Sequence, residues 1–308
     1  MSAVMSKPKL VIIAGPTGSG KSELSLVVAE ALGGEIVNAD SLAFYRHLNI
    51  GTAKPDLADR RRAPHHLIDV AEPDEDFSAA DFMRLARPLV GDLWRKGAVP
   101  LAVGGTGLYL RSLVGGLFEG PAKNQAFRDE LADLARNGHC LYEILQKKDP
   151  LAAAKIKPGD PARIIRALEV LELAGESIVA LQERHKLADE PFDALTIVLD
   201  LPMAEIEERL RRRTKLMFEK GLLDEVEGLL ARGFGPELKP MRSIGYRQCV
   251  EHLAGEKTLD ETIEEVYLRS RQLAKRQRTW FRGQTKEALW LAPEPSQILE
   301  TIRRFVQK

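Results

Sequence analysis

The sequence contains few of the residues that build disulfide frameworks and metal clusters. Its 308 residues include two cysteines, Cys140 and Cys249, whose wide separation suggests neither a disulfide framework nor a paired metal motif. The six histidines are scattered, and the pair His65-His66 follows a proline and precedes an expected strand, which favours a structural role over a ligand role. A reducing cytoplasm is therefore the expected location.

Long hydrophobic runs are missing as well. No run approaches the ~20 apolar residues that cross a bilayer, and the N-terminal segment MSAVMSKPKL lacks the apolar core of a signal peptide. Hydrophobic residues make up 44% and charged residues 29% of the chain, which is typical of globular proteins. The sequence thus predicts a soluble protein of one large domain or two ordinary ones, with no membrane association.

Net charge is also absent, because 45 Lys and Arg residues balance 45 Asp and Glu residues. A zero average argues against a polyanionic partner, but the charges are unevenly placed. Residues 269–286 carry seven Lys and Arg and no acid, and the segment RLRRRTK at 209–215 is a second basic run. Such a run is either a solvated face or a surface that binds a polyanion such as nucleic acid.

A glycine-rich phosphate loop is the strongest local signal that the sequence does contain. It lies between a strand expected at Lys9–Ala14 and a helix expected at Lys21–Leu32. Glycines allow backbone angles at which successive N–H groups point at phosphate oxygens, and the helix N-terminus adds to this attraction. Lys21 supplies a positive charge, and the hydroxyl of Ser22 is placed to bind Mg²⁺. The predicted diphosphate site comprises Gly15, Pro16, Thr17, Gly18, Ser19, Gly20, Lys21 and Ser22.

Strands and helices alternate through the first third of the chain. Beyond the loop, strands are expected at Glu35–Ala39, His66–Val70 and Val99–Val103, and a helix at Ser78–Lys96. This alternation predicts an α/β fold with a P-loop NTPase-like parallel sheet flanked by helices. Ligands of such sheets gather at the carboxyl ends of the strands, where the phosphate loop, Asp40 and Thr106 fall.

From about residue 119 the pattern becomes helical. Helices are expected at 124–137, 141–146, 150–155 and 161–173, before the next strand at 194–201. We therefore predict a helical insertion domain, 119–193, within a core formed by 1–118 and 194–308. The second part of the core is nearly all helix, and its basic run lies on a helix expected at Thr258–Phe281.

The phosphate loop by itself indicates a diphosphate and not a nucleoside. Nucleotide hydrolases usually have an apolar strand that ends in a metal-binding aspartate. The strand LAVGGT ends instead in Gly104-Gly105-Thr106, although the segment HLIDV offers Asp69. The missing acid weakens an ATPase interpretation without excluding it.

Eight segments in order resemble the bacterial tRNA dimethylallyltransferase family, also called tRNA isopentenyltransferases, over essentially the whole chain. They are Gly15–Ser22, Asn38–Ser41, Gly51–Pro55, His65–Asp69, Gly104–Tyr109, Arg163–Glu169, Ser243–Tyr246 and Ala274–Arg282. The resemblance implies transfer of a dimethylallyl group from dimethylallyl diphosphate to N6 of adenosine 37, in tRNAs that read codons beginning with U. It also implies that Mg²⁺ is required and that diphosphate is released.

The resemblance assigns roles to the residues around the loop. Asp40 is expected to act as the base at N6, with Mg²⁺ binding or capping of the following turn as the alternative. Thr106 is expected near the reacting centre, or as a cap of the next helix. Arg209 and Arg213 share a helix face, and at least one is expected to contact the diphosphate, although a surface role stays open for either. Ser22 is the expected Mg²⁺ ligand, with Asp40 as a second.

A tRNA interface is implied too, because an enzyme reaches a stacked base by flipping it into a pocket. Members of the family often have Gln where this chain has Ala43, which leaves the adenine contacts open, and at least one of Trp280 and Phe281 is expected to be a core anchor. The insertion is expected to clamp the anticodon stem. The residues expected near tRNA are Asp40, Ser41, Leu42, Ala43, Thr106, Arg128, Ala162, Arg163, Ile164, Ile165, Arg166, Arg242, Ser243, Ile244, Gly245, Tyr246, Arg247, Lys275, Arg276, Gln277, Arg278, Thr279, Trp280, Phe281 and Arg282.

Three other functions compete with this interpretation. A small-molecule kinase explains the phosphate loop and the parallel sheet, but neither the basic helix nor the insertion. A prenyltransferase acting on free AMP is chemically closer, but it does not need an RNA clamp. A non-catalytic RNA-binding module is disfavoured by the intact Lys21, Ser22, Asp40 and Thr106. Nothing in the sequence requires more than a monomer, which is the expected state.

Overall fold

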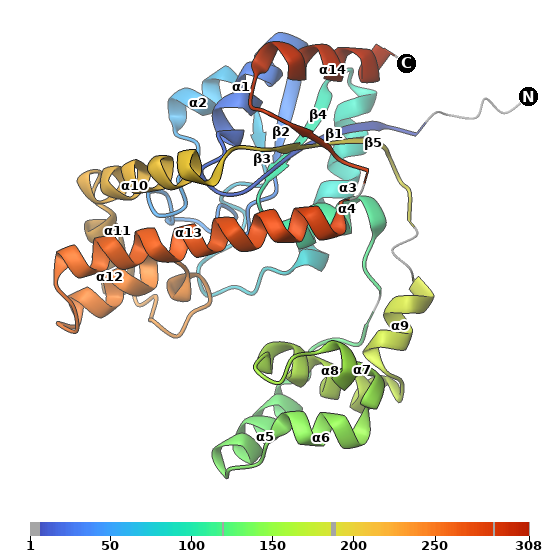
Figure 1. Ribbon diagram of the computed structural model, residues 1–308, viewed down its shortest axis with the longest axis vertical. Helices are drawn as coiled ribbons and strands as arrows, with labels where there is room; N and C mark the ends of the chain where they lie inside the picture. The colour runs from blue at the N-terminus through green and yellow to red at the C-terminus, as the bar shows by residue number, and fades with distance from the viewer. Residues whose placement is uncertain (1–6, 119, 186–188, 286, 308) are drawn as a thin grey trace, which may run out of the picture. The chain divides into compact units, whose positions relative to one another are not determined.

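The computed structural model describes residues 7–118, 120–185, 189–285 and 287–307 (Figure 1). These residues form two compact units. One, the core unit, consists of 1–114 and 190–308, and the other, the helical unit, consists of 115–189. The predicted insertion, 119–193, begins and ends four residues after the helical unit of the structure does. Each unit is described by itself.

The core unit is built on a six-stranded parallel sheet in the order β3-β2-β4-β1-β5-β6. Because neighbouring strands run in the same direction, the loops that follow them meet at one edge of the sheet. The predicted α/β class with a parallel sheet is confirmed. The strands are β1 (Lys9–Ala14), β2 (Gly34–Asn38), β3 (His65–His66), β4 (Val99–Gly104), β5 (Asp193–Leu199) and β6 (Leu289–Leu291).

Helices cover both faces of this sheet, which explains why the five residues of β1 that follow Lys9 are all hydrophobic. Val11 and Ile13 of β1 pack into one hydrophobic cluster with α1 and α14, whereas Leu10 and Ile12 pack into another with α3 and α4 (Figure 1). The helices of the core unit are α1 (Lys21–Leu32), α2 (Leu57–Arg62), α3 (Ala79–Arg95), α4 (Gly107–Gly115), α10 (Met203–Glu219), α11 (Leu222–Ala231), α12 (Tyr246–Leu253), α13 (Leu259–Gln284) and α14 (Pro295–Gln307), with a 3₁₀ turn η1 (Pro240–Arg242).

The expected strand His66–Val70 is wrong, because β3 ends after His66. Leu67 and Asp69 both have a φ of 58°, a left-handed conformation that breaks an extended strand. The turn brings the carboxylate of Asp69 to the ammonium of Lys54, at 2.7 Å, and to the guanidinium of Arg60, at 3.0 Å. The segment after His66 therefore forms a partly buried polar network and does not extend the edge strand.

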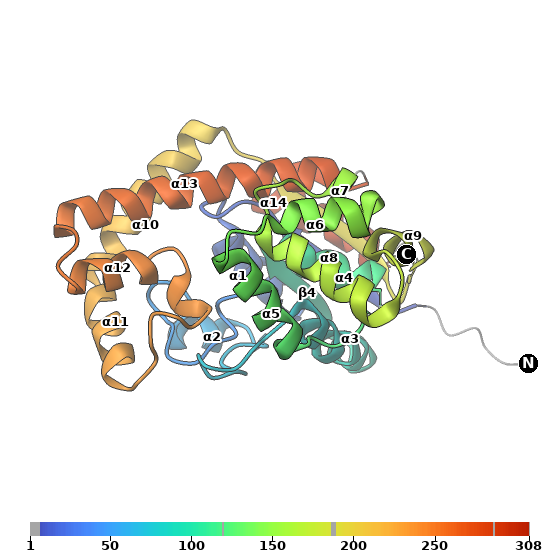
Figure 2. The same cartoon turned by 90° about the horizontal axis from the view of Figure 1, so that it is seen from below.

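The basic helix α13 packs along α10, and both views show the two helices side by side (Figure 2). Leu210 of α10 and Ala274 of α13 are buried in the shared contact. Ion pairs flank it: Arg211 contacts Glu264 at 2.9 Å, and Arg271 contacts Glu207 at 2.5 Å. Part of the positive charge of α13 and α10 thus holds these helices together.

The helical unit has its own hydrophobic core, which includes Leu131, Leu145 and Leu168. Arg128, Arg166 and Glu169 lie beside this core. Four of its five helices match the predicted ones to within two residues at each end, and the last was not predicted. They are α5 (Gln125–Arg136), α6 (Leu141–Lys148), α7 (Pro150–Lys155), α8 (Pro161–Ala174) and α9 (Ile178–His185).

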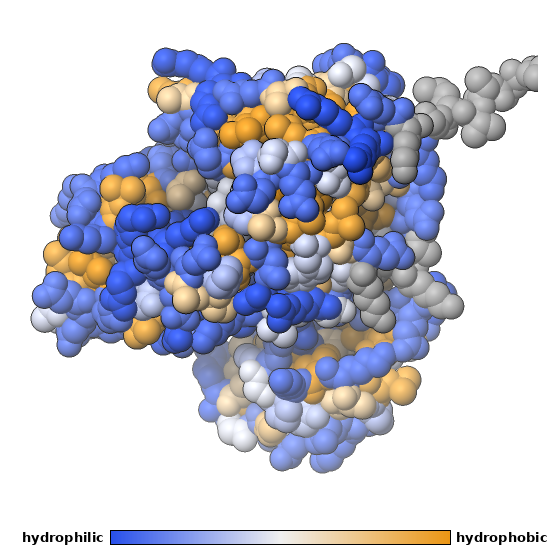
Figure 3. All heavy atoms as spheres, turned by 45° about the horizontal axis from the view of Figure 1, so that its top comes forward, coloured by the Kyte–Doolittle hydropathy of each residue, from blue (hydrophilic) through white to orange (hydrophobic). Residues whose placement is uncertain are grey.

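Most side chains on the face shown in the space-filling view are hydrophilic, and hydrophobic ones form separate patches (Figure 3). Large exposed hydrophobic side chains such as Leu57 and Leu151 come from different elements. Among the described helices, none combines the length and the hydropathy that a membrane span requires.

Candidate active site

The phosphate loop leaves β1 and ends at the start of α1. Gly18 and Gly20 have φ values of 82° and 88°, which only glycine adopts without strain. A Cβ atom at Gly18 would also lie 3.2 Å from the side chain of Leu210. No side chain caps α1, and its first backbone bond runs from Leu24 N–H to the Gly20 carbonyl. The N–H groups of the first turn are therefore open to an anion.

Lys21 lies inside the loop, and its ammonium has no anionic hydrogen-bond partner in the part of the chain that the structure describes. Its Nζ atom donates to the carbonyl of Pro16 at 2.7 Å. Burial lowers the pKa of Lys21 to about 8, with the charge of Asp40 opposing the shift and that of Arg213 adding to it. A bound diphosphate would favour the charged form and raise this pKa again.

Helix α10 places two arginines against the loop. Nη1 of Arg213 donates to Oγ1 of Thr17 at 2.9 Å, and Nη1 of Arg209 lies 3.2 Å from where a Cβ of Gly20 would be. Burial lowers the pKa of Arg213, and the charge of Asp40 opposes that shift. Both arginines predicted from the four-residue spacing therefore face the loop.

Asp40 follows β2 and lines the same cavity as Lys21. Its Oδ1 atom accepts from the N–H of Leu42 at 3.0 Å, and its own N–H donates to Oδ1 of Asn38 at 3.0 Å. One oxygen of Asp40 thus caps the following turn, which is one of the alternative roles expected from the sequence. The other oxygen, Oδ2, has no hydrogen-bond partner among the described residues, which leaves it available to a substrate.

Thr106 connects the loops after β2 and β4. Its Oγ1 atom accepts from the N–H of Ser41 at 3.2 Å, and its carbonyl accepts from the first turn of α4. The ends of these two strands approach so closely that a Cβ at Gly104 would lie 2.3 Å from the carbonyl oxygen of Ala39, and only a glycine permits this. The structure thereby brings Asp40 and Thr106 to adjacent positions at the carboxyl edge of the sheet.

Gln277 lines the same cavity, which the sequence did not predict. It was expected to contact tRNA, but its side chain reaches the phosphate loop and the loop after β4, with hydrogen bonds to Thr17 and Gly105. A single glutamine in a basic helix gives no sequence signal for such a contact.

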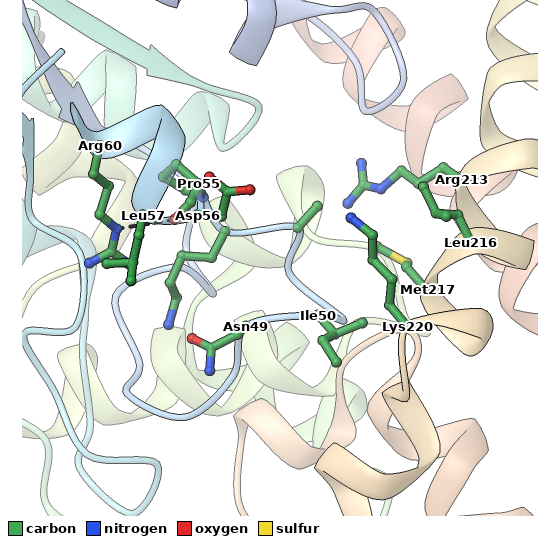
Figure 4. Close-up of a pocket in the computed structure, with 12 residues that line it drawn as sticks. Asn49, Ile50, Pro55, Asp56, Leu57, Arg60, Arg213, Leu216, Met217 and Lys220 are labelled. Carbon is green, nitrogen blue, oxygen red and sulfur yellow. Dashed lines mark hydrogen bonds between the residues drawn. The ribbon is translucent and has the colours of Figure 1, made fainter. Parts of the chain in front are cut away.

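These groups surround a cavity of about 600 Å³, which includes Lys21, Ser22 and Asp40 in its lining. A second cavity of about 590 Å³ adjoins it and shares Arg213 with it. In Figure 4, Arg213 and Lys220 point into the second cavity from one wall, opposite Asp56 on the other. Arg213 therefore has access to ligands in either cavity.

The segment 49–55 lines both cavities and is held by a carboxylate. Glu225 accepts from the N–H groups of Asn49 at 2.9 Å and Ile50 at 2.8 Å, and from the hydroxyl of Tyr246 at 2.6 Å. The Tyr246 ring is fully buried, and a Cβ at Gly51 would lie 2.4 Å from it. Tyr246, which was expected to contact tRNA, has its side chain inside the protein and supports this segment.

Asp69 does not serve as the metal-binding acid of a nucleotide hydrolase. Burial acts to raise its pKa, but hydrogen bonds from Lys54 and Arg60 outweigh that effect and lower it. Both carboxylate oxygens are used by these two cations. In the described ranges, no group of three or more His, Cys, Asp or Glu side chains is arranged to hold a metal ion.

A phosphate-bound Mg²⁺ ion nevertheless fits this site, because Mg²⁺ keeps several waters and takes few protein ligands. The Ser22 hydroxyl is exposed at the start of α1, and it lines the cavity together with Asp40. These two residues are the ones that would hold the ion.

The residues of α13 that were expected near tRNA fall into three groups. Lys275, Arg276, Thr279 and Arg282 are exposed. Phe281 is buried, which fits the core role expected for one of the two aromatic residues. The others contact the core unit: Arg278 pairs with Asp200 at 2.8 Å, and the Trp280 ring packs so closely on Gly107 that a Cβ there would lie 2.2 Å from it.

A small cavity of about 200 Å³ lies beside α13, and four arginines line it. Glu265 lies next to them, and hydrogen bonds from Lys257 and Arg269 hold its pKa down at about 2. Glu251 also pairs with Arg247 at 3.4 Å and with Lys257 at 2.6 Å. Four arginines and a lysine against these two carboxylates leave the surface positive. Ile244 also borders the cavity, whereas Ser243 and Gly245 belong to the turn before α12. The four arginines are Arg242, Arg247, Arg269 and Arg276.

In the helical unit, two arginines that were expected to contact tRNA form ion pairs with a residue of the same unit. Glu169 is fully buried and accepts from Arg128 at 2.7 Å and from Arg166 at 2.6 Å. Ile164 is buried and Ile165 is partly buried. Ala162 and Arg163 are exposed, and Arg163 pairs with Asp160 at 3.3 Å.

Comparison with known families finds similar proteins over most of the chain. A model described as "IPP transferase" matches residues 43–284. "tRNA dimethylallyltransferase 2" of Syntrophus aciditrophicus is 45% identical, with 100% of this chain and 99% of that protein aligned. "tRNA dimethylallyltransferase" of Solibacter usitatus is 48% identical, with 97% and 98% aligned.

Two solved structures are also similar. The tRNA isopentenylpyrophosphate transferase of Bacillus halodurans has a TM-score of 0.71 and 36% identity, covering 98% of this chain and 96% of that one. A eukaryotic dimethylallyltransferase described as acting on tRNA has a TM-score of 0.74 and 31% identity, covering 89% and 69%.

Proposed function

The chain belongs to the IPP transferase family, and we propose that it transfers a dimethylallyl group from dimethylallyl diphosphate to N6 of adenosine 37 in tRNA. The tRNAs are those that read codons beginning with U, and the product is N6-isopentenyladenosine. One observation carries the proposal: an open phosphate loop, two arginines and a carboxylate oxygen that no described residue contacts by a hydrogen bond meet at one cavity.

The phosphate loop holds the donor's leaving group. As the allylic C–O bond breaks, negative charge builds on the diphosphate, and groups positioned beforehand stabilise it. The N–H groups of the loop, Lys21, Arg209 and Arg213 supply this stabilisation. Mg²⁺, when bound at Ser22, neutralises part of the same charge.

Asp40 acts on the acceptor. The exocyclic nitrogen of adenine is a weak nucleophile, because its lone pair is delocalised into the ring. Oδ2 of Asp40 hydrogen-bonds the amine and takes its proton as the new N–C bond forms, while Oδ1 keeps the turn in place. Thr106 accepts a hydrogen bond from the N–H of Ser41, the residue after Asp40, and thereby fixes the position of Asp40.

The positive surface beside α13 contacts the tRNA backbone. The cavity lined by four arginines is suited to a phosphate group, since one guanidinium can donate two parallel hydrogen bonds to a phosphate (bidentate binding). The exposed Lys275, Arg276 and Arg282 extend this surface, and Arg163 provides a contact from the helical unit. Since tRNA is the substrate, we expect the protein in the cytoplasm, acting as a monomer with Mg²⁺.

One assay separates this function from its competitors. The protein is incubated with Mg²⁺ and radiolabelled dimethylallyl diphosphate plus either unmodified tRNA or AMP, and ATP turnover is measured in parallel. We expect label in tRNA only. Label in AMP identifies a prenyltransferase of free nucleotides, ATP turnover alone identifies a kinase, and tRNA binding with no reaction identifies a binding module.

A further inference from the structure

Gln277 lies where three parts of the core unit meet. It belongs to α13, about midway along the basic run. Its Oε1 atom accepts from the N–H of Thr17 at 2.8 Å, and its Nε2 atom donates to the carbonyl of Gly105 at 2.9 Å. One side chain therefore joins the phosphate loop to the loop that carries Thr106.

The chemistry of the two partners fixes the orientation of this amide. A backbone N–H can bond only to the amide oxygen, and a carbonyl only to the amide nitrogen. Gly105 is also the residue that makes room, since a Cβ there would lie 2.5 Å from Nε2 of Gln277. Glutamine is thus the side chain whose length and polarity satisfy both partners.

The surrounding contacts support a positioning role. Two helices hold Thr17 by hydrogen bonds. Arg213 of α10 donates to its hydroxyl, and Gln277 of α13 accepts from its N–H. One turn further along α13, the ring of Trp280 packs on Gly107, directly after Thr106. One face of α13 therefore follows the loop after β4, while Lys275, Arg276 and Thr279 are exposed.

We propose that Gln277 is a positioning residue for the donor diphosphate, which fixes the phosphate loop relative to the loop of Thr106 and does not contact tRNA. The inference rests on the proposed function. By accepting from the N–H of Thr17, which lines the cavity beside it, Gln277 sets the path of the loop, so that the N–H groups at the start of α1 face the diphosphate. The second hydrogen bond of Gln277, to the carbonyl of Gly105, sets the spacing between the leaving group and the acceptor.

The test measures donor binding in the absence of tRNA. The probe is dimethylallyl S-thiolodiphosphate, whose bridging sulfur slows transfer, in the presence of Mg²⁺ and followed by calorimetry. We expect Gln277→Ala to bind it about tenfold more weakly, and Gln277→Glu to bind it at least as weakly, because its charge opposes the diphosphate. The matched control is Gln272→Ala, an exposed glutamine of the same helix, which keeps the donor affinity of the wild type.

A second variant reaches the same contact from the other side. Gly105→Ala places a methyl group against the amide and displaces it without changing Gln277. We expect the same loss of donor affinity, and we expect the double variant Gln277→Ala, Gly105→Ala to be no worse than either single one. Thermal melting of each variant shows whether the fold is kept, and Gln277→Glu preserves the shape of the side chain if Gln277→Ala does not fold.

The two possible roles of Gln277 give opposite results. If Gln277 positions the loop, affinity for the donor analogue falls, the KM for dimethylallyl diphosphate rises and tRNA affinity stays within twofold. If tRNA affinity falls while the analogue binds normally, the inference is wrong and Gln277 is an RNA contact. A wild-type protein that does not bind the analogue overturns the proposed function instead.

Discussion

The phosphate loop and helix α13 both carry groups suited to bind anions, but the structure uses these groups differently. In the loop, the N–H groups at the start of α1 are open, and Arg209 and Arg213 face the same cavity. In α13, Arg271 and Arg278 are paired with carboxylates of other elements. The difference shows that the number of positive residues in a segment does not measure its capacity to bind an anion. What counts is whether each charge already has a partner.

The largest effect is expected at Asp40, next to the open loop. Asp40→Ala is expected to lower the rate of transfer about 10²–10⁴-fold, because the amine loses the group that takes its proton. Affinity for tRNA, measured by filter binding, should change little.

Asp40→Asn is the matched variant for this test. Its amide oxygen still caps the turn at Leu42, but the side chain cannot accept the proton. A variant with near-normal turnover would show that the turn cap is the only role of Asp40. Partial recovery of Asp40→Asn with excess Mg²⁺ would point to metal binding instead.

The paired arginines of the helical unit are expected to show the opposite behaviour, a loss of stability. Glu169→Gln removes the buried carboxylate charge that Arg128 and Arg166 share, and breaking a buried ion pair in this way typically costs about 3–5 kcal/mol. We expect faster hydrogen exchange along α8 in the full-length protein, with little change in the strands of the core unit. Protection as high as in the wild type would show that this network is not needed for stability.

This contribution should also depend on pH. Hydrogen bonds from the two arginines outweigh burial and hold the pKa of Glu169 at about 2. The folded protein therefore binds fewer protons here than the unfolded chain does, so the stabilisation is complete above about pH 4.5 and is lost as the pH falls toward 2. In Glu169→Gln, exchange along α8 should lose this part of its acid dependence.

Two arginines on α13 allow a direct test of paired against exposed charge. Arg276→Ala is expected to weaken tRNA binding a few-fold and to reduce the slope of log affinity against log salt by about 0.7–0.9, with an unchanged melting temperature. Arg271→Ala is expected to keep that slope, because its charge is already neutralised by Glu207, and to lower the melting temperature slightly. Equal slopes in the two variants would show that pairing in the free protein does not decide which arginine binds RNA.

The smallest effect is expected from the protonation of Lys21. Burial lowers its pKa to about 8 in the free protein, and a bound diphosphate requires the charged form. Binding should therefore take up a fraction of a proton near pH 8, and the affinity should fall as the pH rises above that value. Calorimetry with inorganic diphosphate in two buffers of different ionisation enthalpy measures the uptake. In Lys21→Met the uptake should fall to the part that diphosphate itself contributes.

Much of the fold followed from local patterns. β1, α1 and α7 have the predicted bounds, because an apolar strand, a glycine loop and a proline at a helix start are signals contained in a few neighbouring residues. The strand at His66–Val70 failed, since Leu67 and Asp69 adopt positive φ to serve ion pairs with residues earlier in the chain. Local propensity could not reveal that tertiary demand.

The site divides in the same way. The sequence alone determined that a diphosphate loop at Gly15–Ser22 lies near Asp40 and Thr106, because parallel strands bring their carboxyl ends to one edge. Only the tertiary structure decided that Tyr246 supports the segment 49–55, that Asp69 is occupied by two cations, and that Gln277 reaches Thr17, 260 positions away. The physical reason is that backbone conformation is set by near neighbours, whereas the partner of a polar side chain is chosen by whichever distant segment packs against it.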